Sequence, residues 1–140
     1  MYESGVYYGH YKGSKRCGWG TFVFEDGCLY EGSWENDLMC GYGRIIKNNC
    51  IYEGHIKENQ ANGNGKYEDE FRTYSGEWKN DKRNGFGEEE FFTKNKKYIG
   101  NFVNDQYEGK GKLFEEDYVY EGKFKGGLFS GKGKIVYNNR

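Results

Sequence analysis

Glycine and large aromatic residues alternate along this chain in a pattern that recurs six times. Each copy reads Tyr-x-Gly-x, then an aromatic residue or isoleucine, and after six further residues Gly-x-Gly. The copies begin at Tyr7, Tyr30, Tyr52, Tyr74, Tyr98 and Tyr120. The first closing glycine always follows the tyrosine by 11 residues, whereas successive copies are 23, 22, 22, 24 and 22 residues apart. One unit of fixed length is therefore repeated with connectors of variable length, which predicts an elongated array.

Within a unit the period of the pattern is two, which is typical of β-strands. In the fourth unit, Tyr74 and Trp78 lie on one face of an outgoing strand, and Gly85 and Glu89 lie on one face of a returning strand. We expect a six-residue loop over 79–84 between them. This hairpin would place Trp78 opposite Gly85 and Tyr74 opposite Glu89.

The glycines have a physical role in this arrangement. A large ring needs space to lie across a neighbouring strand, and glycine provides that space because it lacks Cβ. We therefore expect rings above glycines and a sheet bent into a trough. Turn signals such as Asp26-Gly27 and Asn48-Asn49 would return the chain to the next unit. The predicted fold class is all-β: one single-layered antiparallel sheet of six tandem β-hairpins, in one domain over residues 1–140, with 1–6 as part of a preceding unit.

Composition agrees with strands. The chain is 35% hydrophobic and 19% aromatic, so aliphatic residues are too few for a thick core, and its 23 glycines disfavour helices. The net charge of −1 argues against a nucleic-acid-binding protein. Residues 1–70 carry 7 basic and 11 acidic side chains, and residues 71–140 carry 14 and 11. This asymmetry would orient a charged partner or favour a homodimer, although ordinary surface variation also explains it.

Cysteine and histidine positions argue against a disulfide or a metal. The cysteines occupy two repeat positions: Cys17 and Cys40 in one, Cys28 and Cys50 in the other. Equivalent positions in adjacent hairpins lie ~10 Å apart, beyond the ~7 Å limit for a bridge. His10 and His55 also share one position, and no Cys-x2-Cys spacing occurs. We expect free thiols and no metal. The first ten residues contain no apolar run typical of a signal peptide, which predicts a cytoplasmic protein.

Catalytic and cofactor motifs are incomplete. Residues 126–133 imitate a phosphate-binding loop, but Gly133 replaces the Ser or Thr that should follow Lys132. The chain has two histidines, and no nucleophile is arranged with a histidine and an acid. We interpret the acidic runs 88–90 and 115–117 as solvated. The sequence therefore predicts neither an enzyme nor a cofactor.

Six copies of this motif resemble MORN (membrane occupation and recognition nexus) repeats over essentially the whole chain. The second unit, Tyr30-Glu31-Gly32-Ser33-Trp34, and the fourth, 74–78, match best, while Ile56 and Tyr11 depart from the preferred Trp or Phe. The resemblance implies a groove-forming sheet that serves as a non-enzymatic scaffold. Such proteins bind partner proteins, often helical segments, or dimerise, and many act at cytoskeletal or ciliary structures.

Two interpretations apply to the aromatic stripe. The rings either stack only on one another, or they leave an apolar strip that binds a helix or extended peptide of a partner protein. The candidate groove residues are Tyr7, Tyr11, Tyr30, Trp34, Tyr52, Tyr74, Trp78, Tyr98, Phe102, Tyr120 and Phe124. We favour the scaffold with an aromatic-lined groove.

The alternative is a peripheral module for phosphoinositides or anionic membranes, in keeping with the family's name. Basic residues cluster around the fourth unit, and further ones follow it. They are Lys79, Lys82, Arg83, Lys94, Lys96 and Lys97, with Lys123, Lys125, Lys132 and Lys134 further on; Lys94, Lys96 and Lys97 are the chief candidates. Each basic residue near an anionic surface contributes ~1 kcal/mol. Acidic residues such as Asp105 and the run 88–90 interleave with this cluster and weaken the alternative.

Overall fold

The chain folds into one elongated antiparallel sheet. The computed structural model describes residues 4–138, which form twelve β-strands and no helix, and therefore no helix that could span a membrane. The strands are β1 (Gly5–Lys12), β2 (Lys15–Phe24), β3 (Leu29–Glu35), β4 (Leu38–Lys47), β5 (Cys50–Lys57), β6 (Gln60–Glu68), β7 (Arg72–Lys79), β8 (Lys82–Phe91), β9 (Lys97–Val103), β10 (Gln106–Phe114), β11 (Tyr118–Lys125) and β12 (Leu128–Tyr137).

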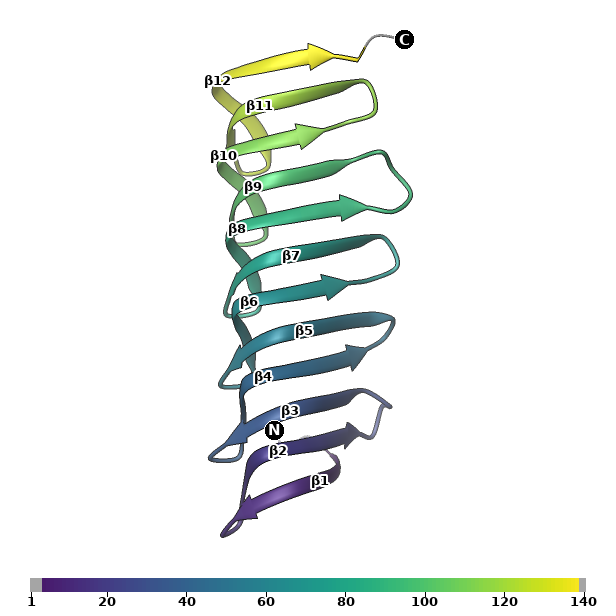
Figure 1. The fold of residues 1–140 in the computed structure, drawn as a ribbon, viewed down its shortest axis with the longest axis vertical. Helices are drawn as coiled ribbons and strands as arrows, with labels where there is room; N and C mark the ends of the chain where they lie inside the picture. The colour runs from purple at the N-terminus through teal and green to yellow at the C-terminus, as the bar shows by residue number, and fades with distance from the viewer. Residues whose placement is uncertain (1–3, 139–140) are drawn as a thin grey trace.

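Each strand pairs with its neighbours in chain order, so the strands lie across the long axis and succeed one another along it (Figure 1). The predicted fold class, a single-layered antiparallel sheet of six hairpins, is confirmed. Of the predicted partial unit over 1–6, residues 1–3 lie outside the described residues, and Gly5 and Val6 open β1 opposite β2.

The hairpin turns are shorter than the predicted six residues. Lys79 pairs with Lys82, so Asn80 and Asp81 alone make the fourth turn, with φ of 48° and 68°. A two-residue turn with both φ positive matches the twist of the flanking strands, and Asn and Asp tolerate this conformation. The same geometry occurs at 36–37, 58–59 and 104–105. The turn signal lay inside the segment that we expected to be a loop.

A β-bulge accounts for the remaining residues. Tyr74 lies opposite Glu89, as predicted, but Trp78 lies opposite Arg83 because the register shifts after Gly76. The expected pairing of Trp78 with Gly85 is wrong. Gly85 has a φ of 109° and pairs with Phe102 of the next unit. The first closing glycine of every unit has positive φ, between 60° and 109°, so its role is a backbone conformation that glycine adopts without strain.

The other two glycines provide space for the tyrosine. A Cβ on Gly43 would lie 2.5 Å from the Tyr30 ring, and one on Gly32 would lie 2.5 Å from the Tyr30 hydroxyl. That hydroxyl donates a hydrogen bond of 2.8 Å to the carbonyl of Ser33, a residue left unpaired across the hairpin by the bulge. In each of the five remaining units the first tyrosine makes the same bond, at 2.7–2.9 Å. Rings above glycines are thus confirmed, with the tyrosine as the covering ring.

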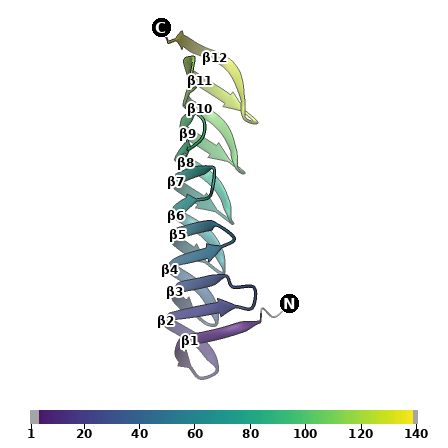
Figure 2. The ribbon, with the colours of Figure 1, turned by 90° about the vertical axis from the view of Figure 1, so that its right-hand side faces the viewer.

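The rings occupy the inside of a bend. The Tyr30 and Trp34 ring centroids are 5.3 Å apart, although four residues of straight strand span ~13 Å. The strand must therefore bend toward the rings, and Figure 2 shows the bent strands from the side. We call the ring-bearing side the concave face and the opposite side the outer face. The predicted trough is present, and its interior holds the core.

Candidate functional site on the concave face

Most of the predicted groove residues are buried. Eight of them are closed off from solvent: Tyr30, Trp34, Tyr52, Tyr74, Tyr98, Phe102, Tyr120 and Phe124. Tyr7 and Trp78 are half-buried, and Tyr11 is exposed. The Trp or Phe ring four residues after the first tyrosine of a unit packs edge-on between that tyrosine and the first tyrosine of the preceding unit. Phe102, for example, lies 5.1 Å from both Tyr74 and Tyr98. These ring contacts account for the eight buried rings. Trp78 makes the same contacts with Tyr52 and Tyr74 but keeps part of its surface accessible in the middle of the array.

A second set of side chains, which the repeat pattern did not place over the rings, occupies the space above them. They occupy the second position of each returning strand: Arg16, Met39, Ala61, Arg83, Tyr107 and Phe129. The Arg16 guanidinium lies 4.5 Å from the centre of the Trp34 ring, and that of Arg83 lies 5.1 Å from Phe102. Arg16, Arg83 and Tyr107 thus lie against the ring of the following unit, whereas Phe129, in the last unit, stacks on Tyr120 of its own unit at 3.9 Å. Ala61 is too small to cover Trp78, which explains why this ring is accessible.

The hairpin turns hold the covering residues in place. The Asp105 carboxylate accepts a hydrogen bond from the Arg83 backbone N–H at 2.8 Å, and the Asp105 N–H donates to the Arg83 carbonyl at 3.0 Å. Asp37 makes the same two bonds to Arg16, Asn59 to Met39 and Asp81 to Ala61. Each turn thereby fixes the preceding unit.

A buried ionic network lies where the fourth unit meets its neighbours. Glu89 is 1% exposed, so our interpretation of the run 88–90 as solvated is wrong for this residue. Its carboxylate accepts hydrogen bonds from Arg72 at 3.2 Å, from Arg83, and from the Tyr107 hydroxyl at 2.6 Å. Burial, with Glu89 alongside, raises the pKa of Tyr107 and keeps this hydroxyl a donor. The bent sheet buries Glu89 because it stands opposite Tyr74, at a position that other units fill with residues such as Leu113.

A hollow of about 340 Å³ opens on the concave face beside this network. We call it the central hollow; its lining is Tyr67, Asp69, Arg72, Trp78, Asp81, Arg83 and Asp105. Trp78 packs against both hydrophobic clusters of the core, so the hollow marks their junction. The buried Nε of Arg72 has no hydrogen-bond acceptor among residues 4–138. The lining of the hollow therefore includes an aromatic ring and an arginine whose buried Nε–H has no acceptor.

The lysines of the membrane alternative are partly neutralised. Lys97 pairs with Glu88 at 2.7 Å and Lys96 with Glu115 at 3.8 Å. The ammonium groups of Lys94 and Lys96 lie 5.8 and 5.3 Å from the centre of the Phe91 ring. The cluster thus presents less free positive charge than its sequence suggests.

The described side chains provide no metal centre, since no three His, Cys, Asp or Glu residues between 4 and 138 are grouped closely enough to hold an ion. All four cysteines are free thiols.

A bent sheet of stacked hairpins, closed by tyrosines over glycines, defines a repeat-array protein with a concave face. The family model of the MORN repeat matches residues 7–29, 30–49, 52–69, 74–96, 98–114 and 120–140, and the chain belongs to the MORN repeat family. The six matches begin at the six tyrosines that open the units. MORN repeats are interaction and membrane-binding modules of a non-catalytic family. A comparison with curated proteins gave no significant match.

Proposed function

We propose that this protein is a non-enzymatic scaffold that binds a helix or extended segment of a partner protein along its concave face, at the central hollow. The observation that carries the proposal is the partly exposed Trp78 ring, in the same lining as Arg72, whose buried Nε–H has no acceptor. Aromatic and arginine side chains in a partly desolvated pocket are typical of binding hot spots.

The same hollow indicates the chemistry of the bound segment. An apolar side chain of the segment would pack on Trp78, and a carbonyl or carboxylate oxygen next to it would accept the Arg72 Nε–H. Both groups can come from one short segment because Arg72 and Trp78 lie on the same strand, β7. Family membership supports a cytoplasmic scaffold within a cytoskeletal or ciliary assembly.

The repeat itself supplies a variant that fills the hollow. Ala61→Arg introduces the residue that the first and fourth units carry at this position, Arg16 and Arg83. Asp81 already bonds the Ala61 backbone in the way that Asp37 bonds Arg16. The new guanidinium should therefore pair with Asp81 and cover Trp78. Ala61→Ser is the matched control, because its side chain is too short to reach the ring.

The experiment is affinity purification from the native cell with wild type, Ala61→Arg and Ala61→Ser, read by mass spectrometry. Circular dichroism first confirms that both variants keep the sheet. A partner retained by wild type and Ala61→Ser but lost from Ala61→Arg supports binding at the central hollow. A partner that all three forms retain would contradict it.

A further inference from the structure

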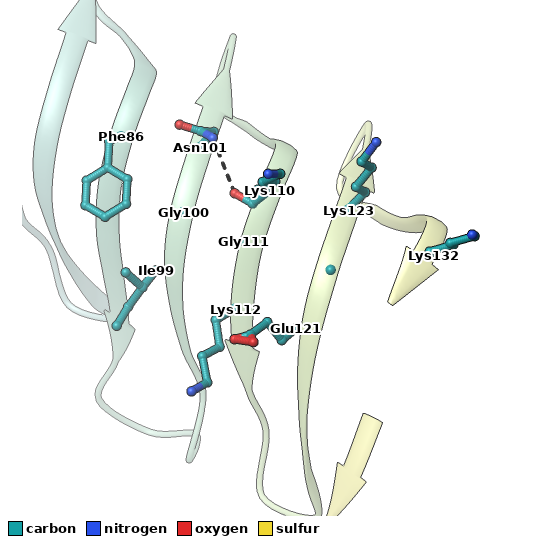
Figure 3. Close-up of a pocket in the computed structure, with 11 residues that line it drawn as sticks. Phe86, Ile99, Gly100, Asn101, Lys110, Gly111, Lys112, Glu121, Lys123 and Lys132 are labelled. Atoms are coloured by element: carbon teal, nitrogen blue, oxygen red, sulfur yellow. Dashed lines mark hydrogen bonds between the residues drawn. The ribbon is translucent and has the colours of Figure 1, made fainter. Parts of the chain in front are cut away.

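The outer face carries a second hollow, on the side of the sheet opposite Trp78. It has a volume of about 530 Å³, and we call it the outer hollow. Its residues come from β8 to β12: Phe86, Ile99, Gly100, Asn101, Lys110, Gly111, Lys112, Glu121, Gly122, Lys123 and Lys132. Figure 3 shows the glycines along the middle, with Phe86 and Ile99 toward one end and lysines on the other strands.

Positive charge is concentrated in the outer hollow at a cost to the sheet. Lys110 and Lys123 lie directly opposite each other on β10 and β11, and like charges in this arrangement are destabilising. Equivalent outer-face pairs in earlier units are not like-charged; Trp19 faces Ser33, for example, and Phe86 faces Asn101. Two other like-charged pairs, Lys12–Lys15 and Lys79–Lys82, lie beside hairpin turns, whereas Lys110–Lys123 lies in mid-strand and concentrates positive charge in the lining of a hollow.

The lysines of the hollow are available to a ligand. None of Lys110, Lys112, Lys123 and Lys132 forms an ion pair within the part of the chain that the structure describes. Glu121 is the one carboxylate in the lining, opposite Lys112. A ligand with several negative charges would therefore be attracted to this site.

Apolar surface adjoins the lysines. Phe86 is 56% exposed, and Ile99 beside it is half-buried. Phe86, Lys110 and Lys132 are equivalent residues of the last three units, so they stand in a row, two strand spacings or ~10 Å apart. An aromatic surface and two cations thus follow one another along the long axis of the sheet.

We propose that the outer hollow binds an acidic segment of a partner protein. An aromatic or aliphatic side chain of that segment packs against Phe86 and Ile99, and its carboxylates pair with Lys110, Lys123 and Lys132. An extended segment rises ~3.3 Å per residue and keeps only every second side chain on one face, so the apolar residue is followed by acidic residues about two or four and six positions away.

The arrangement favours a protein segment over a membrane surface. Proteins that insert into a bilayer project apolar side chains beyond their basic residues. Here Phe86 and Ile99 lie beside longer lysine side chains in the lining of a recess, and Glu121 would face an anionic surface. A segment that alternates apolar and acidic side chains matches this lining, whereas an anionic membrane surface would be repelled by Glu121.

A peptide selection tests this proposal. A display library of random peptides of about 12 residues is selected on wild type and counter-selected on Lys110→Glu/Lys123→Glu, at about 50 mM salt to limit screening. The double variant keeps two like charges opposite each other, so its sheet should be as stable as wild type. The matched control is Lys47→Glu/Lys57→Glu, which changes the net charge equally at exposed residues of β4 and β5.

We expect acidic peptides with one aromatic or aliphatic residue at the predicted spacing. Their affinity should fall about tenfold or more in the Lys110/Lys123 variant, less than about twofold in the control, and by about fivefold as salt rises to about 300 mM. Selected peptides without acidic residues, or equal binding to the double variant, would overturn the proposal. A selection that yields no peptide would also overturn the proposal. Binding of phosphatidylcholine–phosphatidylserine vesicles, or of a single-stranded oligonucleotide, through the same lysines would not rescue it.

This inference is independent of the proposed function. Ala61→Arg acts on the concave face and leaves the outer hollow unchanged, while the lysine substitutions leave the central hollow unchanged. Failure of one proposal therefore does not decide the other.

Discussion

The two hydrophobic clusters of the concave face fill equivalent positions with different chemistry. The first cluster consists of Phe22, Tyr30, Trp34, Tyr52, Ile56 and Ala61, and the second of Tyr74, Tyr98, Phe102, Leu113, Tyr120 and Phe124. In the first, the residues opposite Tyr7 and Tyr30 are Phe22 and Ile45. In the second, Tyr74 has Glu89 opposite it, held by two arginines and Tyr107.

The difference shows what the repeat requires at this position. The Tyr ring needs a neighbour that fills the space beside it, and either an apolar side chain or a fully bonded carboxylate satisfies that need. A buried carboxylate at this position needs hydrogen-bonding partners from β7, β8 and β10, whereas an apolar side chain needs none. The second cluster should therefore be the more sensitive to loss of a single side chain.

The largest expected effect comes from alkali and affects both clusters. Burial raises the pKa of Tyr30 and Tyr52 in the first cluster and of Tyr74 and Tyr98 in the second. Above pH ~10 the unfolded chain releases these protons and the folded chain retains them, so the free energy of unfolding falls. This stability is fully present below pH ~10 and is lost above it, by up to ~1.4 kcal/mol per pH unit for each tyrosine.

Urea unfolding followed by circular dichroism at a series of pH values measures this loss. We expect one cooperative transition whose midpoint is constant up to about pH 9 and then decreases steeply. A midpoint that does not change up to about pH 11 would show that the tyrosines ionise in the folded protein. Two separate transitions would show that the clusters unfold independently.

Glu89→Gln should have the next largest effect and should be confined to the second cluster. It leaves Arg72 and Arg83 without their shared carboxylate. Loss of one partner of a fully buried pair costs ~3–5 kcal/mol, and because both arginines keep some contact with water we expect about 2 kcal/mol.

Hydrogen exchange read by mass spectrometry locates this effect. Exchange in Glu89→Gln should accelerate in β7 to β10 and stay unchanged in β2 to β4, because units of a repeat array contact only their neighbours. Glu88→Gln is the control: it removes an exposed ion pair with Lys97 and should cost less than ~1 kcal/mol. Equal effects of the two substitutions would show that burial of Glu89 adds nothing to stability.

The smallest expected effect is a gain of stability. Lys110→Glu converts the like-charge pair with Lys123 into an opposite-charge pair, which should add about 0.5 kcal/mol. Lys57→Glu is the control because Lys57 lies opposite the neutral Gln60. Thermal unfolding at low salt measures both variants, and the gain should shrink as salt is added. No gain at low salt would show that the two ammonium groups already avoid each other.

The sequence predicted the repeat, the strands and the ring-bearing face because these depend on a period of two that is visible in each unit. It did not predict the bulge, because a glycine required for its φ looks the same as a glycine required for its missing side chain. Gly85 and Gly87 stand two residues apart and have these two different roles.

The candidate site was less predictable. The bonding of Glu89 and the partial exposure of Trp78 each involve a side chain from another unit, Tyr107 and Ala61 respectively. A pattern shared by all units cannot show such a dependence, since it comes from the residues that differ between units. The short turns were predictable, because Asn80-Asp81 and its equivalents carry the residues that a two-residue turn favours.

The bonds between each hairpin turn and the preceding unit have a consequence for how such a chain can evolve. A copied unit brings its own turn and its own covering residue. The turn of the copy can therefore bond the unit before it, and the covering residue of the copy can be bonded by the turn after it. Tandem duplication within the gene would then lengthen the protein by about 10 Å per copy and would require no new kind of contact between units. The length of the array becomes a heritable distance between whatever is attached to its two ends.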